Sequence, residues 1–513
     1  MHPIIASLRP AAAYGFAALA LGSLSAQEPK VYFGNLHSHT AYSDGSGTPK
    51  EAYTYARNVA KLDFIAITEH NHKDAPSRLP AEPGLYNGTA STSVISAARS
   101  ATKNGKFIAL YGQEYSSIGS GNHANVFEVG ELIKASDVPN GAWDKLFDVW
   151  LPAHLDSQGL PAVVLLNHPA QSSSPNEWEY GINDYPTLDA WLVAINRQTS
   201  LINLINGPSH DAGDPPGRPS ESEFRRYLNL GLHVAPTADQ DNHLKNWGNA
   251  ANTRTGVIAT ELTKAALLNA MRNRNVYATQ DKNLRIIGRI NGELMGKRFQ
   301  GSGVPQINQA LNISVEIKDD DEPQAHYKIE VYGDEIGGAD EAKFYGRTNA
   351  LGNGTHTISD VVYPGGTRYY YLKVIQTDED EHVKDQAWLA PFWLEPDASG
   401  VVSPVAVTPA NSDPVLTLDV DLEAEAATIF NSGTSAVDLS GWTLVSVKGN
   451  QRYTIPANTQ LAPGRSLTIT SGPLASTMPP SRLRWTGAPR WADDGDPGEL
   501  LDASGVVRAR TTN

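Results

Sequence analysis

The sequence of 513 residues contains no cysteine. This absence excludes disulfide bonds and a thiol nucleophile, and it leaves only nitrogen and oxygen atoms as strong ligands for a metal ion. A chain of this length buries large cores and does not need disulfides, even in an exported protein. Any metal-dependent chemistry must therefore be sought among its 14 histidines and its 56 aspartate and glutamate residues.

The chain also lacks an excess of positive charge. It has 41 lysine and arginine residues against 56 acidic ones, which gives a formal net charge of -15. Because such a surface repels a phosphate backbone, we expect no bulk nucleic-acid binding. Charged residues make up 19% and apolar residues 40% of the chain, which excludes a disordered or fibrous protein. The length predicts two to four domains.

Beyond the N-terminus no apolar run is long enough to span a bilayer. At the N-terminus, Arg9 precedes an apolar run over residues 11–21, and small residues follow at 22–26. This order is typical of a secretory signal peptide, with a buried N-terminal helix as the alternative. We therefore predict that residues 1–26 are a signal peptide and that the protein is secreted or periplasmic.

Short apolar runs alternate with helical stretches over the first half of the chain. The predicted strands are Val31–Leu36, Phe64–Thr68, Phe107–Leu110, Ala162–Leu166 and His233–Pro236. Between the first two, Thr48 can cap a helix, Pro49 suits its first turn and Glu51 completes a capping box. Strands that alternate with helices indicate parallel β/α units, and several such units suggest a barrel. We predict an α/β domain of this kind at residues 27–283.

The remainder of the chain is rich in β-strand patterns. Residues 284–396 include segments that alternate apolar and polar side chains, such as 313–317, and this predicts an antiparallel β-sandwich. Residues 397–413 are rich in proline, serine, alanine and valine, a linker composition. Residues 414–513 form a last β-rich segment. The predicted fold class is α/β, with a β/α barrel followed by two β-sandwich domains.

Histidines and carboxylates gather in five clusters, each at the end of a predicted strand. The clusters are His37-Ser38-His39 with Asp44, Glu69-His70 with His72, Glu114 with His123, Asn167-His168, and Asp239-Gln240-Asp241-Asn242-His243. In a strand, residues two apart point to the same side, so both imidazoles of a His-x-His motif can face one metal ion. One such histidine is ordinary, but five clusters at strand ends coincide with the edge where β/α barrels assemble active sites. The sequence therefore predicts a metal centre.

These residues resemble the PHP (polymerase and histidinol phosphatase) superfamily of metallohydrolases over residues 31–283. The matching residues are His37-x-His39, Ser43-Asp44-Gly45, Glu69-His70, Glu114, His123, His168 and Asp241-x-His243. The resemblance implies a distorted seven-stranded β/α barrel. It also implies two or three bound divalent ions, which would be Zn, Mn or Fe.

The resemblance assigns nine side chains to three groups of ligands. The first ion would be held by His37, His39, Glu114 and Asp241, the second by Glu114, His123 and His168, and the third by Asp44, His70 and His243. The family has aspartate where Glu69 stands, so we do not assign Glu69 as a ligand. Asp241 is preferred to Asp239 because of its two-residue spacing from His243.

The implied function is hydrolysis of phosphate mono- or diesters through a metal-activated hydroxide. Glu114 and Asp241 would act in catalysis, and we expect His210 to touch a small-molecule substrate. Residues 284–396, with Trp388 and Trp393, resemble the accessory domain of the carbaryl-hydrolase-like branch. That branch makes a carboxylic or carbamate ester hydrolase the alternative. A non-catalytic secreted metal-binding protein is a third hypothesis. Amidohydrolases also begin with His-x-His but bridge their ions with a lysine, where this chain offers Glu114.

The C-terminal segment, residues 414–513, resembles a lamin-tail domain. The matching stretches are Ile429-Phe430-Asn431-Ser432-Gly433, Val437-Asp438-Leu439-Ser440-Gly441-Trp442, Leu461-Ala462-Pro463-Gly464 and Leu501-Asp502. The resemblance implies an immunoglobulin-like sandwich that serves as an anchor or binding module for a surface or polymer. A purely structural cap is the alternative.

Overall fold

The computed structural model describes residues 28–71, 86, 93–116, 122–169, 180–209, 217–337, 342–396, 416–422, 425–431, 436–462, 465–473, 475–477, 482–492, 495–503 and 505–511. The predicted signal peptide (1–26), the predicted linker (397–413), His72 and His210 lie outside these residues. The chain divides into two compact units, Met1–Pro396 and Asp397–Asn513. Within the described part of the chain, no helix is long and apolar enough to cross a membrane.

Seven strands follow one another in space in the order of the chain. They are β1 (Lys30–Asn35), β2 (Phe64–His70), β3 (Ile108–Ser116), β4 (His123–Phe127), β5 (Val163–Asn167), β6 (Thr199–Asn206) and β7 (Ala235–Asp239). The pairs β1–β2, β2–β3, β5–β6 and β6–β7 are parallel, whereas β4 runs antiparallel between β3 and β5. Beyond β1 the sheet continues through two antiparallel strands, β8 (Arg254–Ala259) and β9 (Val276–Thr279).

The sheet curves until the carboxyl ends of β1 and β7 meet. A parallel bridge joins Ser38 to Asn242 just beyond the two strands. The Leu36 amide donates to Oδ1 of Asp239 at 2.6 Å, and the His39 amide donates to the Asn242 carbonyl at 2.9 Å. The strands β1–β9 belong to a 15-stranded sheet, and an isolated bridge joins the segments after β1 and β7 at this point. The closed seven-stranded barrel therefore stays a prediction, while the mixed α/β architecture with mostly strands is confirmed.

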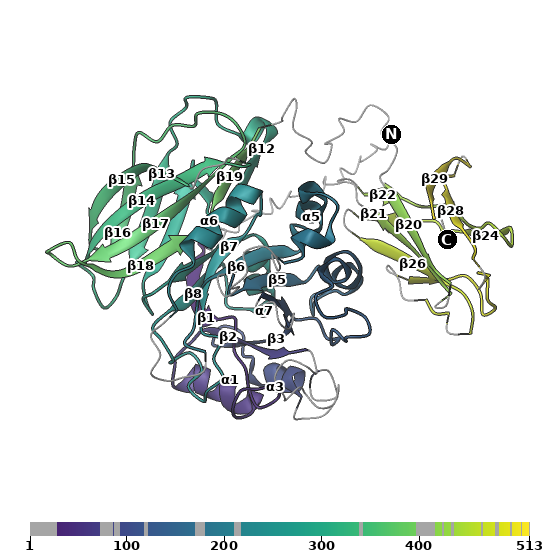
Figure 1. The fold of residues 1–513 in the computed structure, drawn as a ribbon, viewed down its shortest axis with the longest axis horizontal. Coiled ribbons are helices and arrows are strands. Elements are labelled where there is room, and N and C mark those ends of the chain that lie inside the picture. Colours follow the sequence, from purple (N-terminus) through teal and green to yellow (C-terminus); the bar gives the residue numbers. More distant parts are fainter. Residues whose placement is uncertain are drawn as a thin grey trace, which may run out of the picture. The chain divides into compact units, whose positions relative to one another are not determined.

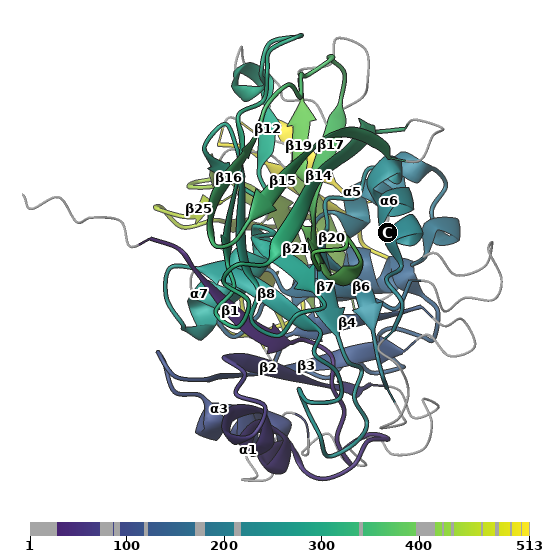
Figure 2. The same cartoon turned by 90° about the vertical axis from the view of Figure 1, so that its left-hand side faces the viewer.

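Helices cover the outer faces of this sheet. They are α1 (Pro49–Asn58), α3 (Val94–Ala101), α4 (Leu151–Ala153, continuing a π-helical segment Lys145–Trp150), α5 (Leu188–Ile195), α6 (Glu221–Leu230) and α7 (Lys264–Arg272). α1 and α3 lie side by side against β2 and β3 (Figures 1 and 2). The predicted capping box of α1 is confirmed, because the Thr48 side chain accepts from the Glu51 amide and the Glu51 carboxylate accepts from the Thr48 amide.

The second half of the first unit consists of strands. They are β10 (Arg285–Ile290), β11 (Glu293–Leu294), β12 (Arg298–Gln300), β13 (Ile313–Lys318), β14 (His326–Glu335), β15 (Lys343–Leu351), β16 (Gly354–Ile358), β17 (Arg368–Thr377), β18 (Val383–Leu389) and β19 (Phe392–Glu395). One four-stranded sheet has the order β11-β10-β13-β16. Its inward face, which includes Ile313, Val315 and Ile317, shares an apolar core with Tyr327 and Ile329 of β14.

The β10–β19 region is joined to the first half by its second sheet. β18 pairs antiparallel with β9, so that Trp388 stands opposite Ala278. The strands β14, β15, β17, β18 and β19 thereby continue the sheet of β1–β9 (Figure 1). One apolar core includes Leu267 and Met271 of α7 together with Ile286 of β10. The two halves therefore share a sheet and a core.

The second compact unit contains two four-stranded sheets. Its strands are β20 (Leu416–Asp421), β21 (Ala426–Asn431), β22 (Val437–Asp438), β23 (Thr443–Ser446), β24 (Gln451–Thr454), β25 (Gln460–Leu461), β26 (Ser466–Thr470), β27 (Arg482–Arg484), β28 (Gly498–Leu501) and β29 (Val507–Arg510). The sheet orders are β20-β21-β26-β27 and β24-β23-β28-β29, and β22 pairs with β25. Trp442, Trp491 and Leu444 are buried in the core of this unit.

Candidate metal centre

The first compact unit brings nine side chains together where β1, β2, β3, β5 and β7 end. They are His37, His39, Asp44, His70, Glu114, His123, His168, Asp241 and His243. Three groups have ligand atoms within 4.8 Å of one another: His37, His39, Glu114 and Asp241; His39, Asp44, His70 and His243; and His70, Glu114 and His123. Each group could hold a metal ion. His168 stands beside them, with Nε2 at 3.3 Å from Oε1 of Glu114.

The first group is the most deeply buried. Nε2 of His37 lies 3.2 Å from Nε2 of His39, and the two nitrogens lie 3.2 Å and 3.1 Å from Oδ1 of Asp241. Two atoms bound to one zinc ion at 2.0–2.1 Å in a tetrahedron stand about 3.3 Å apart. Facing ring nitrogens at this distance need a proton or a cation between them. The donor set and its spacing therefore fit a divalent ion.

Glu114 occupies the middle of the cluster. Its Oε1 lies 3.1 Å from Nε2 of His37 and 3.1 Å from Nδ1 of His123, and its Oε2 lies 3.0 Å from Nδ1 of His70 and 3.3 Å from Nε2 of His39. The carboxylate is 1% exposed, and Oε2 has no hydrogen bond of regular geometry among the described residues. One carboxylate thus faces imidazoles from several strands, the arrangement that a bridging ligand requires.

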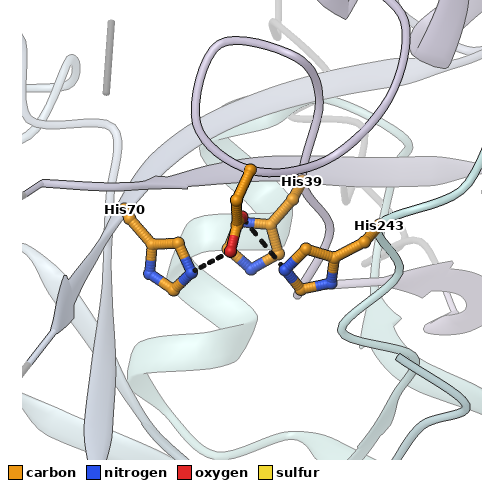
Figure 3. A group of neighbouring side chains, drawn as sticks. His39, His70 and His243 are labelled. Carbon is orange, nitrogen blue, oxygen red and sulfur yellow. Dashed lines mark ion pairs between the residues drawn. The ribbon is translucent and has the colours of Figure 1, made fainter. Parts of the chain in front are cut away.

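The group around Asp44 is drawn in Figure 3, where the rings of His39, His70 and His243 surround a carboxylate. Oδ2 of Asp44 lies 3.3 Å from Nε2 of His70, and Oδ1 lies 3.1 Å from Nε2 of His243. The His39 ring stacks on both other rings, with centroids 4.5 Å and 4.2 Å apart. Nδ1 of His39 is 3.9 Å from Oδ1 of Asp44. His39 therefore stands between this group and the first one.

A tight turn brings Asp44 back over the end of β1. The amides of Ser43 and Gly45 donate to the Thr40 carbonyl at 3.1 Å and 2.9 Å. A Cβ atom at Gly45 would lie 2.7 Å from the carbonyl carbon of His39, so only glycine fits this close approach. The sequence Ser43-Asp44-Gly45 is thus matched to the geometry of the turn.

The electrostatics of the cluster favour cations. Burial opposes ionisation of Glu114, but His37, His123 and His70 outweigh it and hold its pKa well below the ordinary value. Burial likewise opposes protonation of His37, yet the carboxylates of Asp241 and Glu114 raise its pKa. The pKa of Asp44 is lowered against the effect of burial, chiefly by its contacts with His243 and His70. The raised histidine pKa and the lowered carboxylate pKa values show that positive charge is favoured between these ligands, where a metal ion would replace protons.

The backbone turns sharply at two candidate ligands. His168, directly after β5, has φ 32°, and Asp241, two residues after β7, has φ 48°. Residues other than glycine rarely adopt this left-handed region, and such conformations concentrate at functional sites. At both positions the chain turns just after the strand, and the side chain lies beside Glu114 and the histidines.

Three uncharged residues support the ligands, and of these the sequence predicted only Asn167 as part of a cluster. The side-chain amide of Asn167 donates to Oε1 of Glu114 at 2.8 Å, and the side-chain amide of Asn206 donates to Oδ2 of Asp241 at 3.1 Å. The hydroxyl of Ser116 lies 2.6 Å from Nδ1 of His70. Asn206 is the last residue of β6, as Asn167 is of β5, so the same rule that polar strand ends form the site would have found it.

Two buried carboxylates beside the cluster face the backbone. Glu69 accepts from the Thr40 amide at 3.0 Å and from the hydroxyls of Thr40 and Ser43. Asp239 accepts from the Leu36 amide and from side chains on β6 and β8. Burial raises the pKa of both. Among the pair of aspartates, the structure therefore places Asp241 and not Asp239 among the histidines.

Other histidines lie outside the three groups. Nδ1 of His154 is 2.6 Å from the Trp150 carbonyl, and Nε2 of His233 is 2.7 Å from Glu395. His72 and His210 fall outside the described residues. Ser209, which precedes His210, accepts a hydrogen bond at its carbonyl from the His243 amide at 2.9 Å.

Comparison with known proteins gives one family match. The lamin tail domain model matches residues 401–513. No curated protein matches the chain. Among solved structures, the chain is similar to a two-domain Bacteroides vulgatus protein described as containing a predicted PHP-like metal-dependent phosphoesterase. The identity is 15%, the match covers 70% of this chain and 95% of that one, and the TM-score is 0.37. A YadV chaperone matches at 10% identity and a TM-score of 0.16, over 45% of this chain and all of that one.

Proposed function

We propose that this protein is an exported, metal-dependent hydrolase of phosphate mono- or diesters. The observation that carries the proposal is the meeting of six imidazoles and three carboxylates, five of the imidazoles lying 3.0 to 3.3 Å from Glu114. A structural zinc ion takes four ligands and closes its coordination sphere. Eight side chains in three groups, with His168 beside them, exceed that need and suit several ions. Bound divalent ions would activate a water molecule and neutralise charge on the phosphoryl oxygens.

The chain leaves one side of the cluster accessible. The side chains of His37 and His39 are fully buried, whereas those of Asp44 and His123 are 14% and 20% exposed. A substrate would therefore approach from the side of Asp44 and His123. Because the carboxylates are ionised, a phosphate would be repelled until cations compensate them. Substrate binding thus depends on the same ligands as ion binding.

The chain's own residues orient the ligands. Asn206 fixes Oδ2 of Asp241, so that Oδ1 faces His37 and His39. Asn167 fixes Oε1 of Glu114 in the same way. This support positions Glu114 and Asp241 for the catalytic roles proposed for them, and hydrogen bonds of this kind raise metal affinity. His210 is proposed to contact the substrate, because Ser209 is bonded to His243.

The test is hydrolysis by protein stripped with a chelator and reloaded with Zn, Mn or Fe. We expect turnover of nitrophenyl phosphate mono- or diesters, and loss of it in Glu114→Ala. His154→Ala is the matched control, because it removes a histidine outside the three groups. Turnover of carboxylic or carbamate esters alone would favour the alternative ester hydrolase. Inactivity with every ion and ester would contradict an enzyme and favour a metal-binding protein.

We also propose that the second compact unit binds a surface or polymer, on the basis of the lamin tail match at residues 401–513. The test is co-sedimentation of the full chain and of a chain ending at Pro396 with cell-wall and polysaccharide particles. We expect only the full chain to sediment. Equal sedimentation of both would contradict the proposal.

A further inference from the structure

A second cluster of carboxylates lies at one end of the β10–β19 region and shares no residue with the metal centre. Asp281 stands between β9 and β10, Asp319 directly follows β13, and Glu322 lies in the loop to β14. One oxygen from each of the three carboxylates lies within 4.8 Å of the other two. Carboxylates alone are common on protein surfaces, so a second feature must indicate a ligand.

That feature is Gln376 on β17. Across neighbouring antiparallel strands, Gln376 stands opposite Tyr327 of β14 and Asp385 of β18. Residues directly opposite each other point to the same face of a sheet. Tyr327 reaches the carboxylate cluster, because its hydroxyl donates to Oδ2 of Asp319 at 3.2 Å. The Gln376 side chain therefore lies on the same face of the sheet as Tyr327 and Asp385, and the charges of Asp281 and Asp319 act on Asp385 as well.

The amide oxygen of Gln376 lacks a partner among the residues that the structure describes. The residue is 4% exposed, and its buried Oε1 accepts no hydrogen bond from this part of the chain. A buried carbonyl oxygen without a partner is unfavourable unless another group satisfies it. Side-chain amide oxygens are ligands that Ca²⁺ uses together with carboxylates. The orphaned oxygen therefore points to a cation at this position.

The carboxylate of Asp319 can still bind a cation. Its Oδ1 accepts from the amides of Asp321 and Glu322 and from the Asn283 side chain, which fixes the carboxylate in place. Its Oδ2 accepts from the Tyr327 hydroxyl at 3.2 Å. One lone pair on Oδ2 is left, and Asp319 is fully buried.

The nearby basic side chains offset the charge of the cluster only in part. Lys282 pairs with Asp321 at 3.9 Å and Arg285 with Asp320 at 3.3 Å, both at the periphery. Among the described residues, no lysine or arginine forms a salt bridge with Asp281, Asp319 or Glu322. The buried Arg254 donates through Nη1 to the backbone carbonyls of Ala251 and Thr253, and the charge of Asp281 partly offsets the lowering of its pKa by burial.

The carboxylates also repel one another. Burial and the charges of Asp319 and Asp321 raise the pKa of Asp281, and burial with the charges of Asp281 and Asp319 raises the pKa of Asp385. A buried negative cluster of this kind is stabilised by a cation.

We propose that Asp281, Asp319, Glu322 and the amide oxygen of Gln376 bind a calcium ion. All four ligands are oxygens, which suits a hard cation, whereas the histidine-rich centre suits transition metals. The ion joins the β9–β10 turn to β13 and β17, so it fastens the first half of the unit to the β10–β19 region. Extracellular calcium modules bind with Kd of about 10⁻⁴ to 10⁻³ M, the range expected here.

The test uses the full chain with its histidine-rich centre already loaded with Zn²⁺, so that Ca²⁺ reports on the second site. We expect calorimetry to show one additional Ca²⁺ per chain. We expect 10 mM CaCl₂ to raise the Tm of the first unit by roughly 2 to 5 °C. Ester hydrolysis is not the readout, so the result is independent of the proposed function.

Three variants make the test specific. Glu322→Gln removes one charge from an exposed ligand, and Gln376→Met removes the amide oxygen while keeping the volume. Both should weaken Ca²⁺ binding at least tenfold. Asp320→Asn is the matched control, because it removes an acid of the same loop that pairs with Arg285 and Lys318, and it should bind as the parent does. No Ca²⁺ binding at 10 mM, or equal affinity in all four proteins, would overturn the proposal.

Discussion

Oε1 of Glu114 lies 3.1 Å from Nδ1 of His123, and the two residues stand on neighbouring antiparallel strands. Because β4 runs back along β3, His123 returns to the carboxylate only nine residues later in the sequence. The same carboxylate faces His37 through Oε1 and His70 through Oε2. Glu114 therefore contacts five of the six histidines among the candidate ligands.

We therefore expect Glu114→Ala to lose two ions together, whereas His70→Ala loses one. Nδ1 of His70 is engaged by the Ser116 hydroxyl at 2.6 Å, so its Nε2, beside Asp44, remains for one ion. The measurement is metal content per chain by mass spectrometry after dialysis against the metal. His154→Ala should retain the full content. Equal metal loss in the Glu114 and His70 variants would contradict the shared role of Glu114.

Glu69 provides a test of the support behind the ligands. Its carboxylate holds the Thr40 amide and the hydroxyls of Thr40 and Ser43, and Ser43 in turn lies 3.3 Å from Nδ1 of His39. Glu69→Ala should lower affinity for the ion beside Asp44 by about 10- to 100-fold, because the turn loses its anchor. Competition with a coloured chelator measures this affinity.

The matched control for Glu69→Ala is Glu51→Ala. Glu51 lies in the first turn of α1, where its carboxylate accepts from the Thr48 amide. Among the described residues it contacts no candidate ligand. That variant should leave metal affinity unchanged. If the two variants bind metal equally well, Glu69 has no positioning role.

The sequence patterns located the polar strand ends but ended some strands too early. β3 was predicted to end at Leu110, yet it continues to Ser116 and carries Glu114 within it. Hydropathy ends a strand where polar residues begin, whereas here Gln113 and Glu114 are buried by β4 and by the site itself. A functional site places polar residues in a buried strand, which is where the pattern misleads.

The pairing of strands that are far apart in the sequence could not be predicted from local sequence patterns. The antiparallel course of β8 against β1, and of β18 against β9, joins segments far apart in the sequence. Alternation along β13 predicted which residues of that strand are buried, and Ile313, Val315 and Ile317 are indeed in the core. It could not predict that the second sheet of this region would continue the first half of the chain.

The division of the chain predicts that the metal centre does not need the C-terminal unit. All nine candidate ligands lie within Met1–Pro396, which has its own apolar cores. A chain ending at Pro396 should retain its metal content and its Tm within about 2 °C, since units with separate cores unfold separately. Calorimetry of both chains checks this, with the second transition absent from the short chain. Precipitation or metal loss on truncation would contradict it.

Glu395 should make the stability of the first unit depend on pH. It lies 2.7 Å from Nε2 of His233 and 2.8 Å from Arg298, so it links the segment before β7 to β19. Burial raises its pKa, but the contact with His233 and the charge of Arg298 outweigh this and lower the pKa from 4.5 to about 2. A depressed carboxyl pKa stabilises the folded state above the unfolded pKa, and this stability is lost as pH falls from about 4.5 towards 2.

The lowered pKa limits the contribution of ionised Glu395 to the free energy of unfolding to about 3 kcal/mol. The 15% exposure of the side chain reduces this contribution further. Glu395→Gln should therefore unfold more readily in urea than the parent at pH 7. The difference should shrink as the pH approaches 3, because the parent carboxyl then takes up a proton on unfolding. Glu335→Gln is the control, since its partner Arg368 is 3.3 Å away and its side chain is 55% exposed. A Glu395→Gln deficit that is the same at pH 7 and pH 3 would show that charge is not its cause.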